Sequence, residues 1–174
     1  TELLSKHVVS TQGISPGDTA MMRACFWEVQ FTDEAKWLLM QSTPDIGHHF
    51  SGCSFILRDP QTAPVELLNG FRMCGERAWG KAGIAIGKMG TLPVSIYTGQ
   101  AFDANCPVLE VKYNTEHPAI YSLCTSERYP AELRQLDAKV DVAVAAMDKV
   151  PFDLDHWTKV AEERYPNGLP QPYT

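Results

Sequence analysis

Residues 130–150 read PAELRQLDAKVDVAVAAMDKV, and their hydrophobic side chains recur at steps of three and four. This spacing places the hydrophobic side chains on one face of an amphipathic helix. Pro130 suits the first turn of such a helix and Pro151 its end. We therefore predict one continuous helix over residues 130–149, whose buried face consists of Leu133, Leu136, Val140, Ala143, Val144 and Met147.

The segments on either side of this helix contain further periodic patterns. Residues 153–165 repeat apolar residues at helical spacing, which predicts a second helix. Upstream, short apolar runs are separated by turn residues, a pattern typical of strands in a mostly antiparallel sheet. The expected strands cover residues 49–58, 65–74, 92–97, 108–113 and 119–124, with the last two joined as a hairpin.

Near the beginning of the chain, the spacing of apolar residues also changes, from that of a strand to that of a helix. Residues 25–31 alternate apolar and polar side chains, as in a half-buried strand. Thr32 then suits the N-cap of a short helix that would run through Trp37 and stop before Pro44. This order of elements predicts an α+β fold, in which a curved, mostly antiparallel sheet carries the long C-terminal helix across its concave face.

This order of elements resembles the helix-grip architecture of START-like proteins. The resemblance covers the order of the helices and strands and no sequence motif. It therefore implies a shape for the fold and carries no implication for function.

The composition limits the classes of function. The chain has 174 residues, a formal net charge of −6 and 44% hydrophobic residues, which is typical of a globular protein, and we expect a single domain over residues 1–174. The acidic balance argues against a nucleic-acid partner, because such binding depends on clustered Lys and Arg. No apolar run approaches the roughly 20 residues that span a bilayer, so we expect no transmembrane segment.

The spacing of the cysteines and histidines indicates no metal site. The five cysteines include no close pair, and His48 and His49 would point to opposite faces of a strand. Buried, reduced cysteines favour a cytoplasmic protein. Because the sequence begins with Thr1 and not with Met, removal of a signal peptide would instead indicate a periplasmic or secreted protein.

A glycine-rich stretch, residues 75–82, reads GERAWGKA and matches the spacing of a phosphate-binding P-loop up to its last position. Ala82 has no hydroxyl group that could bind magnesium, and the bulky Trp79 lies inside the loop. We therefore expect no nucleotide and no other cofactor.

The alternation of side chains along the expected strands selects three candidate ligand-binding residues. His49, Asn69 and Tyr121 each share a strand face with apolar residues, so each must pair with the backbone or contact a ligand. Glu110 and Lys112 occupy the alternate positions of their expected strand, on the face away from the apolar residues, and are expected to face solvent.

Two classes of function remain. The first is a small-molecule binding protein or an enzyme, with an apolar pocket between the sheet and the C-terminal helix that takes a small apolar or amphipathic molecule. The second is a non-catalytic protein-interaction module, such as an inhibitor or immunity-type protein, for which the acidic charge and the absence of a catalytic motif are typical. Whether the protein is an enzyme stays open.

Overall fold

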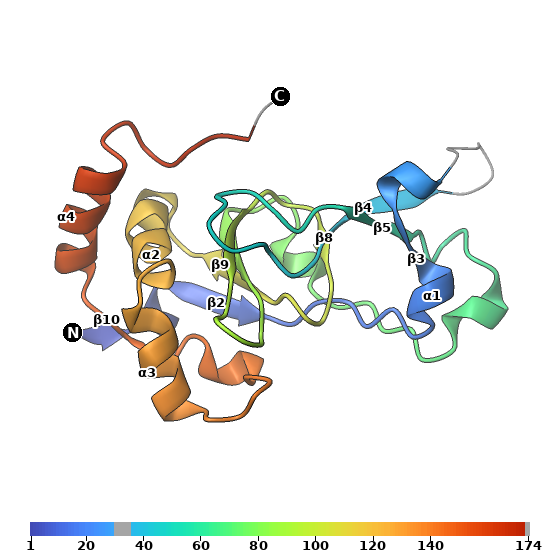
Figure 1. The fold of residues 1–174 in the computed structure, drawn as a ribbon, viewed down its shortest axis with the longest axis horizontal. Helices are drawn as coiled ribbons and strands as arrows, with labels where there is room; N and C mark the ends of the chain where they lie inside the picture. Colours follow the sequence, from blue (N-terminus) through green and yellow to red (C-terminus); the bar gives the residue numbers. More distant parts are fainter. Residues whose placement is uncertain (30–35, 173–174) are drawn as a thin grey trace.

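A computed structural model describes residues 1–29 and 36–172. These residues form an elongated molecule with most of its helical structure at one end (Figure 1). Helices α2, α3 and α4 lie at that end, and α1 lies at the other with strands β3, β4 and β5. The helices are α1 (Thr19–Met22), α2 (His117–Cys124), α3 (Arg128–Leu136) and α4 (Leu154–Arg164).

The helical end contains an antiparallel four-stranded sheet of order β2-β9-β6-β7. Strand β9 pairs with a neighbour on each side, and all four of its residues are buried. Buried strands in the interior of a sheet satisfy their backbone groups through both neighbours. The strands of this sheet are β2 (Val8–Thr11), β6 (Gly83–Ile86), β7 (Val94–Tyr97) and β9 (Val108–Val111).

A second four-stranded sheet has the order β3-β5-β4-β8. Its β3, β5 and β4 pair antiparallel, whereas β4 and β8 run parallel. A short ladder also pairs β1 (Glu2–Leu3) with β10 (Pro151–Phe152). The strands of the second sheet are β3 (Arg23–Cys25), β4 (Trp37–Gln41), β5 (Phe55–Arg58) and β8 (Ala101–Phe102).

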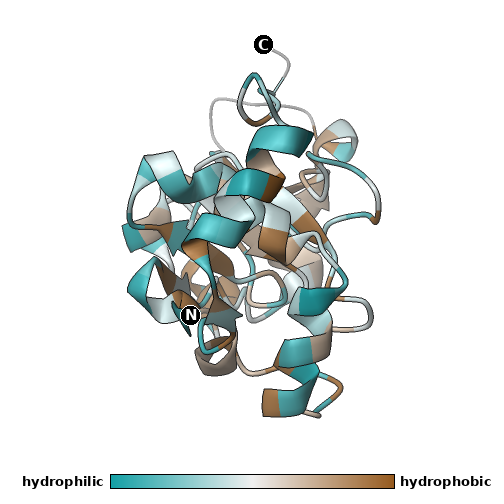
Figure 2. Cartoon of the chain, turned by 90° about the vertical axis from the view of Figure 1, so that its left-hand side faces the viewer, coloured by the Kyte–Doolittle hydropathy of each residue, from teal (hydrophilic) through white to brown (hydrophobic). Residues whose placement is uncertain are grey.

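The largest hydrophobic core lies between the first sheet and helices α2, α3 and α4. Helix α2 supplies a buried face to this core and packs against α4. Viewed from the helical end, the turns nearest the viewer are mostly hydrophilic, with hydrophobic residues among them (Figure 2). Helices α3 and α4 therefore each turn one apolar side to this core, whereas residues 119–124 of α2 are all buried. Its largest fully buried side chains include Leu4, Ile84, Ile86, Tyr121, Tyr129 and Phe152.

The structure confirms the α+β class, with mostly antiparallel sheets and a packed C-terminal helix. Helix α4 occupies nearly the residues expected for the second helix. The side chain of Asp153 caps it by accepting a hydrogen bond from the backbone N–H of His156 at 3.1 Å. Strands β7 and β9 also lie where the sequence predicts them.

The predicted continuous helix over residues 130–149 is wrong. Helix α3 ends at Leu136, and the carboxylate of Asp137 accepts hydrogen bonds from the backbone N–H groups of Lys139 and Ala143. An aspartate that bonds to nearby backbone groups favours a turn over a helix interior. These same bonds lower the pKa of Asp137. Leu133 and Met147 are buried as expected, but Val140 is 72% exposed.

The predictions for the N-terminal third are also largely wrong. Residues 23–25 form β3, but a 3₁₀ turn at Phe26–Glu28 interrupts the expected strand over residues 25–31. Residues 37–41, expected in a helix, form β4, which pairs with β5. The expected N-cap, Thr32, lies outside the described residues. The apolar residues with helical spacing cover only a short segment here. The hydrogen bonds between paired strands therefore decide its structure.

Three of the strands expected from the sequence also differ from the structure. The second arm of the expected hairpin is helix α2, with Pro118 in its first turn. Residues 65–68 form a 3₁₀ turn, and the strand expected over residues 49–58 begins only at Phe55. Short apolar runs do not distinguish a strand from a buried helix, and this ambiguity explains the first error.

Leu133 in α3 and Val140 in the loop after it supply a direct test of the corrected structure. Leu133→Asp should lower the free energy of unfolding by at least about 3 kcal/mol, because it buries an unpaired charge. Val140→Asp should change this free energy by no more than about 0.5 kcal/mol, because the side chain is exposed. Urea unfolding measures the free energy of unfolding of both variants. Equal losses in the two would contradict the assignment of the residues after Leu136 to a loop.

Candidate functional site

A cleft of about 750 Å³ opens at the helical end of the molecule. Its walls come from the loop after β4, the segment that leads into β7, the junction of α2 and α3, and the end of α4. The lining residues are Ile46, Gly47, His48, His49, Thr91, Leu92, Pro93, Val94, Tyr121, Cys124, Thr125, Ser126, Glu127, Pro130 and Tyr165.

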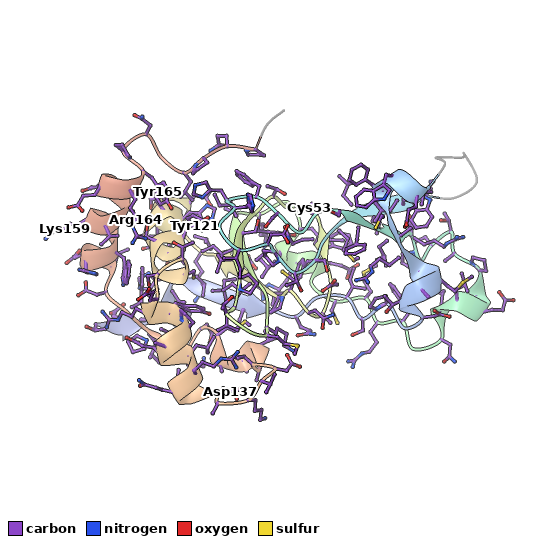
Figure 3. The ribbon with its side chains drawn as sticks, viewed as in Figure 1. Cys53, Tyr121, Asp137, Lys159, Arg164 and Tyr165 are labelled. Carbon is purple, nitrogen blue, oxygen red and sulfur yellow. The ribbon has the colours of Figure 1, made fainter. Side chains whose placement is uncertain are left out.

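Two tyrosines reach this cleft from adjacent helices. Tyr121 lies on the buried face of α2, and Tyr165 directly follows the last residue of α4. Their ring centroids are 5.9 Å apart, and Figure 3 shows the two side chains close together beside Arg164. The packing of α2 on α4 therefore determines the distance between the two rings.

The loop that carries His49 is bound to the edge of the first sheet. The carbonyl of His49 accepts a hydrogen bond from the backbone N–H of Ile96 in β7 at 2.8 Å. Further along the loop, the backbone N–H of Ser51 donates to the hydroxyl of Ser95 at 3.2 Å. These bonds hold the backbone at His49 and just after it against β7, which fixes the place from which the imidazole reaches the cleft.

The imidazole of His49 and the phenol of Tyr121 form a hydrogen bond. The Nδ1 atom of His49 lies 2.9 Å from the Tyr121 hydroxyl. The His49 ring also lies 5.9 Å from the ring of Tyr121 and 6.0 Å from that of Tyr165, measured between centroids. The three rings form a small aromatic cluster, in which His49 and Tyr165 meet edge to face and the other two pairs are tilted.

Burial keeps two potential nucleophiles of the cleft protonated. Burial, and then the neighbouring Tyr165 and Cys124, raise the pKa of Tyr121. Burial also raises the pKa of the Cys124 thiol. A nucleophile or general base needs a lowered pKa or a pKa near neutrality, so neither side chain suits that role. Both can donate a hydrogen bond.

Two of the three residues selected from the sequence meet in this cleft. His49 and Tyr121 are in contact, although they lie on a loop and a helix and not on the strands that led to their selection. Asn69 follows the 3₁₀ turn Val65–Leu68, is exposed, and lies outside the lining of the cleft. The strand that placed Asn69 on an inner face is absent from the described structure, since residues 65–68 form this turn.

Sequence reasoning missed Tyr165. It is the last aromatic residue of the pattern that predicts the C-terminal helix, and its position beside Tyr121 depends on how α2 and α4 pack. No local pattern carries that information. The adjacent pair His48 and His49 was also misjudged, because both residues line the cleft from one loop.

The glycine-rich stretch is not arranged as a P-loop. Lys81 and Arg77 each lie 3.0 Å from a carboxylate oxygen of Glu110, and residues 83–86 after the loop form strand β6 and not a helix. Glu110, expected to face solvent, is only 8% exposed. The two cations compensate its charge, which explains how it can lie in a buried strand.

The described residues show no metal cluster, no disulfide and no membrane-spanning helix. Among them, no three His, Cys, Asp or Glu side chains come together in a way that could hold a metal ion. All five cysteines are free thiols. Within residues 1–29 and 36–172, no helix is long and apolar enough to cross a membrane. Comparison of the chain with protein-family models and with curated proteins found no match.

The raised pKa of Tyr121 predicts a change in alkaline stability. The folded protein holds this phenol proton in a pH range where the unfolded chain releases it, so the stability it contributes is complete below about pH 10 and is lost as the pH rises further. Tyr121→Phe should therefore make the decline in unfolding free energy shallower by about 1.4 kcal/mol per pH unit above that point.

Urea unfolding at several pH values between about pH 9 and pH 11 measures this slope. Tyr113→Phe is the matched control, because the ring of Tyr113 is exposed, and it should leave the slope unchanged. A Tyr121→Phe variant with the wild-type slope would show that the folded protein does not retain this proton.

Proposed function

We propose that the protein binds a small amphipathic molecule in the cleft formed around His49, Tyr121 and Tyr165. The observation that carries this proposal is the hydrogen-bonded pair of His49 and Tyr121 within an otherwise largely apolar lining. Ligand sites commonly combine apolar walls with a few oriented polar groups. The volume of about 750 Å³ lies in the range of roughly 300–1,000 Å³ that is usual for such sites.

The rim of the cleft supports binding of an apolar body. Ile46 is 73% exposed there, and Pro93 and Val94 line the cleft from the segment that leads into β7. Contact with a ligand would remove this apolar surface from water, at a gain of about 25 cal/mol per Å² before the costs of association. The partly exposed ring of Tyr165 adds a surface on which a flat molecule could pack, and the buried ring of Tyr121 lies behind it.

Binding fits the chemistry of this cleft better than turnover. The raised pKa values of Tyr121 and Cys124 remove both as nucleophiles at neutral pH. Glu127 is the one carboxylate among the lining residues. A hydrolytic or transfer reaction would need an activated nucleophile with a positioned base, and these groups do not supply that pair.

The alternative function is a protein-interaction module of the inhibitor or immunity type. It is favoured by large apolar side chains that stay exposed at the opposite end of the molecule, among them Trp27 and Leu39. Exposed aromatic residues are enriched at protein interfaces.

Fluorescence titration with Nile red, a neutral aromatic dye, tests the proposed cleft. Ile46→Asp should raise the Kd of the dye by about tenfold or more, because it places a charge on the apolar rim. Val65→Asp is the matched control, because Val65 is also exposed, at 81%, and lies outside the cleft. Asn69→Ala should likewise leave the Kd unchanged.

Equal affinity of the dye for the wild type and both aspartate variants would contradict ligand binding in the cleft. Native mass spectrometry of the freshly purified protein separates the two functions further. A retained small mass that is lost in Ile46→Asp supports ligand binding, whereas a second protein in place of a small mass favours the interaction module.

A further inference from the structure

The hydroxyl of Tyr121 restricts where the proton of His49 can lie. Tyr121 is 2% exposed, and within the described part of the chain its hydroxyl has one hydrogen-bond partner, the Nδ1 atom of His49. A buried O–H proton without an acceptor is costly. The hydroxyl therefore donates to Nδ1, and a neutral imidazole that accepts at Nδ1 carries its proton on Nε2.

The second nitrogen of His49 is consequently a donor. Nε2 lies across the ring from Nδ1 and so points away from the Tyr121 hydroxyl. His49 lines the cleft and is itself exposed. The N–H at Nε2 thus remains available to a molecule in the cleft, while the Nδ1 side is occupied.

The charge around the cleft limits what this donor can bind. Among its lining residues, Glu127 is the one carboxylate, and there is no Lys or Arg. The guanidinium of Arg164 donates to the backbone carbonyl of Ser122 at 3.5 Å and is not part of the lining. A carboxylate ligand would meet the negative charge of Glu127 with no fixed cation to offset it.

We infer that Tyr121 is a positioning residue, which holds His49 with its proton on Nε2 so that the cleft selects a neutral carbonyl compound with an aromatic or apolar body. This inference rests on the proposed function. The ketone, amide or ester oxygen of such a ligand accepts the hydrogen bond from Nε2, and its apolar body packs against the partly exposed ring of Tyr165 and the apolar lining of the cleft. Donor-only molecules and carboxylates are disfavoured.

The tautomer can be measured without any ligand. Long-range ¹H–¹⁵N correlation of the imidazole nitrogens at neutral pH should show His49 protonated at Nε2 in the wild type, with the signals assigned by their loss in His49→Gln. Tyr121→Phe keeps the ring in the core and removes the hydroxyl, so it should move the His49 shifts toward a mixture of tautomers. Tyr113→Phe should leave them unchanged.

A wild-type His49 protonated at Nδ1 would overturn the inference, and so would His49 shifts in Tyr121→Phe equal to those of the wild type. Because Phe preserves the packing of the ring, a purely structural role for Tyr121 would not move the nitrogen shifts.

The ligand class is tested with three fragments of similar size, acetophenone, aniline and benzoate, titrated while the His49 signals are followed. Acetophenone should bind at least about fivefold more tightly than the other two, and this preference should decrease in Tyr121→Phe. Equal binding of all three would overturn the inference and leave the proposed function standing. Binding of neither these fragments nor Nile red would overturn both.

Discussion

The carboxylate of Asp103 is buried where the two four-stranded sheets meet, and their connection depends on its hydrogen bonds. Its Oδ2 atom accepts from the hydroxyl of Ser42 at 2.5 Å, and its Oδ1 atom accepts from the backbone N–H of Asn105 at 2.8 Å. Its backbone also bridges to Ile14, beyond the end of β2. Burial raises the pKa of this carboxyl, and the hydrogen bonds from Ser42 and Asn105, together with the guanidinium of Arg23 at 3.9 Å, oppose that effect.

The cleft depends on this junction through the loop that follows it. Ser42 is the first residue after β4, and the loop from there to β5 carries His49. The buried side chain of Gln41 donates to the carbonyls of Ser42 and Ser51 at 2.7 Å each, which ties the two sides of the loop together. The second sheet thus fixes the start of the loop, the first sheet holds its middle, and the helical layer supplies Tyr121.

The parts predicted correctly from the sequence are those whose signal is local. Helix α4 has both an apolar repeat and the Asp153 cap, and β9 has an apolar run bounded by a proline and a polar turn. The loop after α3 was missed because the bonds of Asp137 compete with an apolar repeat that continues past it. His49 and Tyr121 were selected from the alternation of side chains along expected strands, but His49 lies on a loop and Tyr121 on helix α2, so their meeting in one cleft does not follow from that argument. Their contact, and the presence of Tyr165, depend on tertiary packing that no local pattern specifies.

The pairing of β2 with β9 also determines the order in which the chain can fold. Val8 pairs with Val111, and Glu2 pairs with Phe152 in the ladder of β1 and β10. A ribosome must therefore synthesise most of the chain before the first strands find their partners. Contacts between residues so distant in the chain carry a high contact order, which slows folding. During synthesis, the hydrophobic strand Val8–Thr11 stays unpaired and is open to aggregation or to chaperone binding until β9 emerges.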